Sequence, residues 1–219
     1  MPRRRPLVIG HRGAPGYRPE HTPFIPVSEH HGDWNWGNVQ SAGGCCLVVG
    51  DTLYFYVSGR KGVQGSPSSG VCATGLATLR RDGFVSMDAG EAEGVLLTRP
   101  VRFSGKRLFV NANAGGGELR VEVCDTSGAP LPGFTRADCV PLTADAACAG
   151  VAWNSGGDLG VFAGKPVRFR FYLRQGGLYA FWVSPDEGGA SHGYVAAGGP
   201  GFTGPTDTVG RAAPQRHGL

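Results

Sequence analysis

Residues 167–184 read VRFRFYLRQGGLYAFWVS, and this stretch decides the fold class. Apolar and polar side chains alternate through its first seven residues, which is the pattern of a strand with one face in a core and one in water. The inward-facing residues are Val167, Phe169, Phe171 and Leu173, and the outward-facing residues are Arg168, Arg170 and Tyr172. A glycine pair then separates this run from a second apolar run, GLYAFWVS. We therefore predict two strands here.

The same alternation continues on the N-terminal side of this stretch, in RLFVNANA and LRVEVCD. In the second run Leu119, Val121 and Val123 are predicted to face inward, and Arg120 and Glu122 to face water. Pairs of Arg and Glu across neighbouring strands are expected on the wet face, where each contributes little stability. Turn residues recur every 8 to 12 positions, as in a sandwich. We predict a jelly-roll-like, two-sheet β-sandwich over residues 91–210, followed by a flexible tail, 211–219.

Composition supports an all-β protein. The 219 residues include 38 Gly and 16 Pro, which together interrupt helices too often for a helical bundle or coiled coil. No apolar run is long enough to span a membrane, and no signal peptide is recognisable, so the sequence leaves the compartment open. The net charge of +4 comes from arginines near the two ends. A continuous basic face is lacking, and we therefore expect no nucleic-acid partner and no membrane partner.

Residues 23–90 predict a separate antiparallel sheet. The runs CLVV and TLYFYV flank Gly50 and Asp51, which is a hairpin signal. Two further short strands follow around Arg81, Asp82 and Gly83. Four short strands with tight turns are typical of one propeller blade, so we expect a propeller-blade-like sheet appended to the sandwich.

These two regions together resemble one enzyme class. The segments WNWGNVQSAGG, GDTLYFYVSGR and GLATLRRDGFVSMDAG are similar to the closing blade of five-bladed β-propeller glycosidases of families 32 and 43. The segments DAGEAEGVLLTRPVRFSGKRLFVNA, GLYAFWVSPDEGG and GYVAAGGPGFTG resemble the C-terminal β-sandwich of the same enzymes. In those families the catalytic carboxylates come from earlier blades, which are absent here. The resemblance thus implies a carbohydrate-associated accessory or binding module of glycoside hydrolase lineage without catalysis of its own.

Residues 1–22, MPRRRPLVIGHRGAPGYRPEHT, resemble a different family, the glycerophosphodiester phosphodiesterases. The resemblance implies an acid/base role for His11, a phosphate contact for Arg12 and a metal-site role for Glu20. The ExD carboxylates that such an enzyme needs next do not follow. We therefore interpret the chain as a composite whose first 22 residues form an arm. A hydrolase remains the alternative function, either as a relic metal-dependent phosphodiesterase or as a glycosidase that uses another carboxylate such as Asp33.

Aromatic residues are the candidates for binding a poly- or oligosaccharide, because sugar rings stack on Trp and Tyr. The alternative for each is ordinary packing in a core or a seam. The candidate residues are Trp34, Trp36, Tyr54 and Tyr56 in the blade region and Tyr172 and Trp182 in the sandwich. A second alternative function is structural self-association, in which a homodimer forms through the open edge of the blade.

Histidines and cysteines give weaker signals. His30, His31 and Asp33 form an HHxD cluster that could hold calcium or another divalent metal, and no other cofactor is predicted. The six cysteines lack the spacing of a zinc site. Cys139 and Cys148 could form a disulfide in an oxidising compartment, and buried free thiols are the alternative.

Overall fold

The computed structural model describes residues 25–213, and their regular structure consists of β-strands and two short 3-10 helices. Contacts divide the chain into two compact units, which we describe separately. The first contains the described residues up to Cys46 together with Tyr54–Thr78, and the second contains Leu47–Leu53 and the chain from Leu79 onward. None of the helices in the described part is long and apolar enough to cross a membrane.

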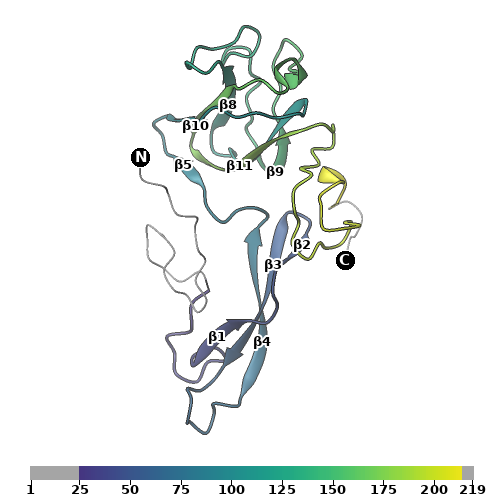
Figure 1. Ribbon diagram of the computed structural model, residues 1–219. Helices are drawn as coiled ribbons and strands as arrows, with labels where there is room; N and C mark the ends of the chain where they lie inside the picture. Colours follow the sequence, from purple (N-terminus) through teal and green to yellow (C-terminus); the bar gives the residue numbers. More distant parts are fainter. Residues whose placement is uncertain (1–24, 214–219) are drawn as a thin grey trace, which may run out of the picture. The chain divides into compact units, whose positions relative to one another are not determined.

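The appended sheet has four strands, and β3 pairs with each of the other three (Figure 1). Strand β3 (Thr52–Arg60) pairs with β1 (Asn38–Ser41), β2 (Leu47–Val49) and β4 (Cys72–Arg80). The Gly50–Asp51 turn between β2 and β3 is present as the sequence predicts. Gly50 has a φ of 59°, a left-handed conformation that glycine adopts without steric cost.

Two further antiparallel sheets form the sandwich. One has the order β6-β10-β8 and the other the order β5-β11-β7-β9. Their bounds are β5 Met87–Ala89, β6 Gly94–Leu97, β7 Arg107–Asn113, β8 Glu118–Cys124, β9 Asp145–Gly150, β10 Arg168–Arg174 and β11 Gly176–Ser184. Short 3-10 helices lie at Leu159–Phe162 and Gly210–Ala212. The predicted all-β fold, a two-sheet sandwich with an appended antiparallel sheet, is confirmed.

The sandwich core lies where the alternation placed it. All seven residues predicted to face inward on β8 and on 167–173 are buried, at 6% exposure or less. Phe171 of the three-stranded sheet packs against Phe181 of the four-stranded sheet, with ring centroids 5.1 Å apart. Leu108 and Val110 of β7 complete this core from the other side. Period two therefore predicted which face of β8 and of β10 is apolar and inward.

Glu122 is the exception to the predicted wet face, because its side chain is buried. It faces Arg170 directly across β8 and β10, and the two side chains form an ion pair. Residues 125–136 fold over this part of the sheet. There the backbone N–H of Arg136 donates to the Glu122 carboxylate at 3.3 Å, and the carbonyl of Gly128 accepts from the Arg170 guanidinium at 2.9 Å. The expected Arg/Glu pair exists, but a loop shields it from water.

The remaining outer face, on the four-stranded sheet, is covered by the C-terminal segment. Gly189 packs so closely on Phe109 that a Cβ there would lie 2.8 Å from the ring. The backbone of the same segment holds β2, because the N–H of Val48 donates to the carbonyl of Gly198 at 2.8 Å. The second unit therefore includes residues 47–53, which the predicted boundary at residue 90 assigned to the blade.

All six cysteines are free, so Cys139 and Cys148 do not form the disulfide that we considered. Burial raises the pKa of Cys148 to about 11 and also raises the pKa of Cys139. Burial likewise raises the pKa of Cys124 to about 11. These three thiols are protonated at neutral pH and behave as small apolar groups.

Candidate functional site

Trp34 packs directly on the backbone of the appended sheet, at a position that we call the Trp34 seat. Its six-membered ring lies over two glycines on neighbouring strands, Gly59 of β3 and Gly75 of β4. A Cβ at Gly59 would lie 2.3 Å from Cε3 of Trp34, and a Cβ at Gly75 would lie 2.4 Å from Cη2. The tryptophan nevertheless remains 42% exposed. The two glycines thus make room for an aromatic ring that is held against the backbone on one side and reaches solvent on the other.

The loop that carries Trp34 is closed by local contacts. The backbone N–H of Trp36 donates to the carbonyl of Asp33 at 3.2 Å, and that of Asp33 donates to His30 at 3.2 Å. The ring of His31 lies against Trp36, with centroids 4.3 Å apart. Trp36 is half-buried in this contact. These turns fix the entry of the chain into β1 and hold Trp34 in place.

The predicted metal cluster does not form within residues 25–213. His31 stacks on Trp36, and the Asp33 carboxylate accepts a hydrogen bond from the hydroxyl of Ser28. No group of three His, Cys, Asp or Glu side chains in the described part is arranged to hold a metal ion. His30, His31 and Asp33 lie close together in a turn, but their side chains are not arranged around one point.

Tyr54 and Tyr56 lie on the opposite face of the sheet from Trp34. Side chains alternate along a strand, and Gly59 presents its Cα hydrogen, in place of a side chain, toward Trp34. Tyr54 and Tyr56 are five and three positions before Gly59, so they point the other way. Tyr56 is 46% exposed, and Tyr54 is half-buried. The four aromatic residues predicted in the blade region therefore do not form one site.

A polar cavity lies beside the far end of β3. It has a volume of about 330 Å³, and its lining includes the side chains of Asn38, Arg60, Gln64 and Ser69. Asn38 and Arg60 are directly opposite each other in the pairing of β1 with β3. The part of the chain that the structure describes contributes no carboxylate to this cavity. The cavity thus offers an amide from each of two residues, a hydroxyl and one guanidinium.

Hydrogen bonds fix the loop that forms one wall of this cavity. The Arg60 guanidinium donates to the carbonyl of Ser69 at 3.2 Å, and the N–H of Gly37 donates to the carbonyl of Arg60 at 2.8 Å. Within the loop, Ser66 and Ser69 close successive turns. Gly62 is buried against these turns, and a Cβ there would lie 2.3 Å from Oγ of Ser68. These contacts hold the loop in place as one wall of the cavity.

The two aromatic candidates of the sandwich serve its packing. The hydroxyl of Tyr172 donates to Glu122 at 2.9 Å, and Arg136 lies 4.4 Å above the Tyr172 ring. Trp182 stacks on Phe109 at 5.8 Å and donates from its indole nitrogen to the carbonyl of Gly189 at 3.0 Å. Tyr172 belongs to the three-stranded sheet and Trp182 to the four-stranded sheet. Both have the packing role that the sequence analysis gave as the alternative.

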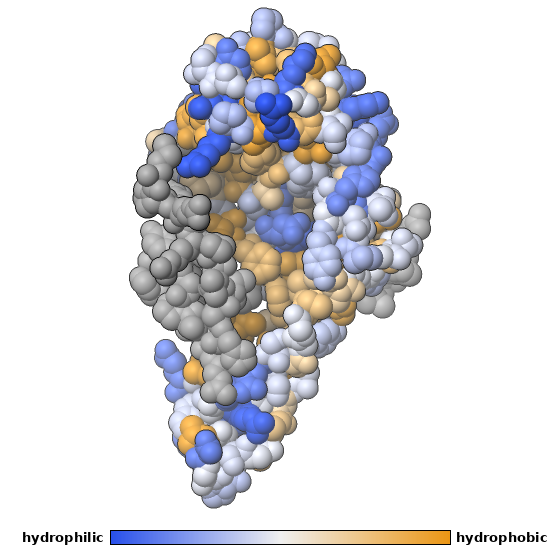
Figure 2. Space-filling model, viewed as in Figure 1, coloured by the Kyte–Doolittle hydropathy of each residue, from blue (hydrophilic) through white to orange (hydrophobic). Residues whose placement is uncertain are grey.

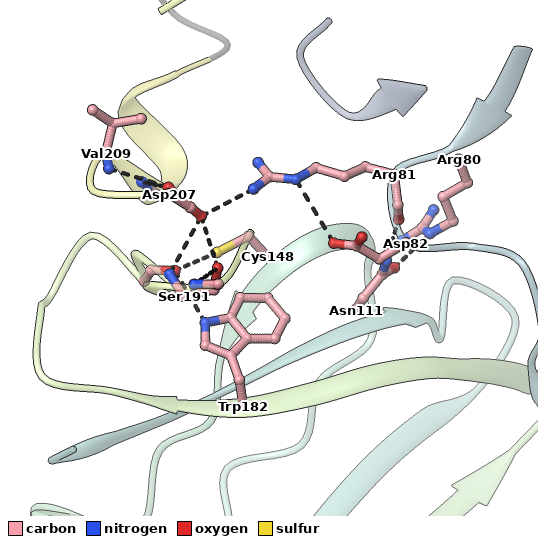
Figure 3. Close-up of polar contacts among 12 residues, drawn as sticks. Arg80, Arg81, Asp82, Asn111, Cys148, Trp182, Ser191, Asp207 and Val209 are labelled. Carbon is pink, nitrogen blue, oxygen red and sulfur yellow. Dashed lines mark hydrogen bonds and ion pairs between the residues drawn. The ribbon is translucent and has the colours of Figure 1, made fainter. Parts of the chain in front are cut away.

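A second polar cluster surrounds Asp207 in the sandwich unit (Figure 3). Its buried carboxylate accepts from the Arg81 guanidinium at 2.9 Å and from the backbone N–H groups of Val209, Gly210 and Ser191 at 3.1, 2.8 and 3.3 Å. Burial acts to raise the pKa of Asp207, but these donors outweigh it and the pKa lies below its ordinary value. The adjoining pocket, beside Cys148 and Trp182, has a volume of about 30 Å³. It can hold water but not a sugar ring.

Sequence reasoning missed the residues that build the cavity and the seat of Trp34. Gly59 and Gly75 lie inside strands, and a glycine there often marks a close approach of another group. This signal was available. No sequence pattern marked Asn38, Gln64 and Ser69 as lining residues. The cavity lies between the end of a strand and a loop, and its lining is set by the conformation of that loop. The catalytic candidates His11, Arg12 and Glu20 lie outside the described residues.

Comparison with known proteins gave no relative: no family model, no curated protein and no solved structure matches this chain.

Proposed function

We propose that this protein is a carbohydrate-binding module in which the appended sheet presents Trp34 to a poly- or oligosaccharide. The observation that carries the proposal is the seat of Trp34 on Gly59 and Gly75. A ring that binds a sugar by stacking must be exposed and must also be held in place, because a mobile ring loses conformational entropy on binding. Trp34 meets both requirements, since 42% of it is exposed while the backbone supports its other side.

The resemblance of residues 34–204 to the last blade and sandwich of propeller glycosidases also favours a saccharide ligand. In those enzymes the catalytic carboxylates lie on blades other than the last one, so we propose that the region described here binds a saccharide and does not itself hydrolyse it. The lower end of the appended sheet, at the bottom of Figure 2, shows mainly hydrophilic and intermediate residues and a few hydrophobic ones. Such a surface suits a hydrated polymer better than an apolar partner.

Affinity electrophoresis in gels that contain plant or microbial polysaccharides tests this proposal. We expect the wild-type protein to be retarded by at least one polysaccharide, and Trp34→Ala to lose about tenfold in affinity because the stacking surface is removed. Tyr194→Ala is the matched control, since it removes an aromatic ring that is 79% exposed in the other unit. Retardation that survives Trp34→Ala, or none with any polysaccharide, would count against the proposal.

A second candidate function is self-association through β4. Among the described strands, β4 pairs with β3 alone, so its other edge has backbone groups free to pair with a second copy. Leu76 on this strand is 50% exposed. Sedimentation velocity across a concentration series tests this function. We expect a dimer in the wild type and a monomer in Leu76→Lys, and a wild-type monomer at all concentrations would exclude it.

A further inference from the structure

The cavity beside the end of β3 has a different chemistry from the Trp34 seat. Among the described residues, its polar lining holds one cation, Arg60, and no acidic group. The guanidinium carries five N–H donors, and in the described part of the chain one of them is used, toward the carbonyl of Ser69. Within residues 25–213 no carboxylate lies at ion-pair distance from Arg60, whereas six of the other eleven arginines in this range have such a partner. Among these residues the exposed guanidinium of Arg60 therefore has donors that are not used and no carboxylate partner.

A polar stripe leads along the sheet to this cavity. Tyr56, Ser58 and Arg60 alternate along β3 and share one face. Asn38 and Gln40 of β1 face Arg60 and Ser58 in register, so they belong to the same face. The stripe thus begins with a half-exposed aromatic ring, continues with a hydroxyl and two amides, and ends at the guanidinium.

These groups match one kind of ligand. A ring stacked on Tyr56 would have its hydroxyl groups beside Ser58 and Gln40, which both donate and accept hydrogen bonds. A carboxylate at the next sugar would reach Arg60, whose planar group is suited to bidentate contact with a carboxylate. The volume of about 330 Å³ lies at the small end of the range for ligand pockets. A neutral sugar would bring no anionic group to pair with the guanidinium of Arg60.

We infer that this cavity and stripe form a subsite for an acidic saccharide, and that Arg60 binds the carboxylate of a uronic acid residue. The inference rests on the proposed function, because it assumes a saccharide ligand. It is also separate from that proposal, since the stripe and Trp34 lie on opposite faces of the sheet. Acidic and neutral polymers are therefore expected to respond to different substitutions.

Isothermal titration with two related ligands tests the inference: an oligogalacturonide and the same oligosaccharide after its carboxyl groups have been reduced to alcohols. We expect the wild type to bind the acidic form about two- to fivefold more tightly, which is the range for an ion pair at an exposed side chain such as Arg60. Arg60→Gln should abolish this preference and leave binding of the reduced form unchanged. Gln64→Ala, at another exposed lining residue, should weaken binding of the acidic form without removing the charge.

Lys61→Gln is the matched control. It removes the same charge from the neighbouring exposed residue, which does not line the cavity. If Lys61→Gln weakens binding as much as Arg60→Gln, the attraction is general and the inference is wrong. Equal binding of the two oligosaccharides by the wild type would also overturn it and would leave the proposed function intact. Failure to bind either oligosaccharide would overturn the acidic subsite, whereas the proposed function would fail only if neutral polysaccharides were not bound either.

Discussion

Glu122 and Arg170 face each other across β8 and β10 and form an ion pair that the loop 125–136 covers. The Glu122 side chain is only 5% exposed, so the low-dielectric surroundings make the loss of one partner costly. Arg120, on the same face of β8, pairs instead with the more exposed Glu118. The two pairs lie on the same face of β8, and they differ because the loop covers one of them and leaves the other more exposed.

Arg170→Met is expected to destabilise the sandwich by about 3 kcal/mol or more, because it leaves the buried Glu122 carboxylate without its cation. Urea unfolding followed by circular dichroism measures this change. The control is Glu187→Gln, which breaks the exposed pair with Arg107. That variant should change stability by about 1 kcal/mol at most. Equal effects of the two variants would show that the loop does not shield Glu122.

The lowered pKa of Asp207 predicts that the stability of the fold depends on pH. Its pKa is below the ordinary value in the folded protein, so its contribution is full above the pKa of the unfolded chain and is lost as the pH falls through the folded pKa. Asp207→Asn removes that dependence. We expect the wild type to be clearly more stable than Asp207→Asn at pH 7, and the difference to shrink steadily below pH 4. A difference that stays constant down to pH 2 would contradict this assignment.

The seat of Trp34 predicts different outcomes for substitutions of glycine by alanine. A Cβ at Gly59 or Gly75 would overlap the indole ring, so Gly59→Ala should displace Trp34 and cost about 1–3 kcal/mol. Gly70→Ala is the control, because no atom lies within 4 Å of the added Cβ. Tryptophan fluorescence and denaturant unfolding measure the two effects. If Gly59→Ala and Gly70→Ala behave alike, Trp34 is not packed as described.

Cysteine reactivity tests the burial of the thiols. Cys45 and Cys72 are exposed, while burial raises the pKa of both Cys124 and Cys148 to about 11. In native protein at pH 8, Ellman's reagent should modify Cys45 and Cys72 within minutes. Cys124, Cys139 and Cys148 should react only on unfolding. Mass spectrometry of the labelled peptides identifies the sites, and rapid labelling of Cys124 would contradict the packing of β8.

Sequence reasoning predicted the sandwich from the alternation in β8 and β10, and Phe169, Phe171 and Val121 are buried as expected. It predicted that Glu122 faces water, whereas the loop that covers Glu122 has no alternating pattern from which its path could be predicted. It grouped Trp34 with Tyr56 as candidates for the same ligand, but their side chains point to opposite faces of the appended sheet. Alternation identifies faces within a strand, whereas the position of Trp34 is decided by a turn and by two glycines distant in sequence.

The hydrogen bond from Val48 to Gly198 also has a consequence for synthesis on the ribosome. The two residues lie 150 positions apart in the sequence, so β2 emerges long before its partner. Contacts of such high sequence separation form late, because a long loop must be closed first. Until then the β2 edge stays available to other nascent chains. We therefore expect chaperone demand during translation to last until the segment around Gly198 has emerged.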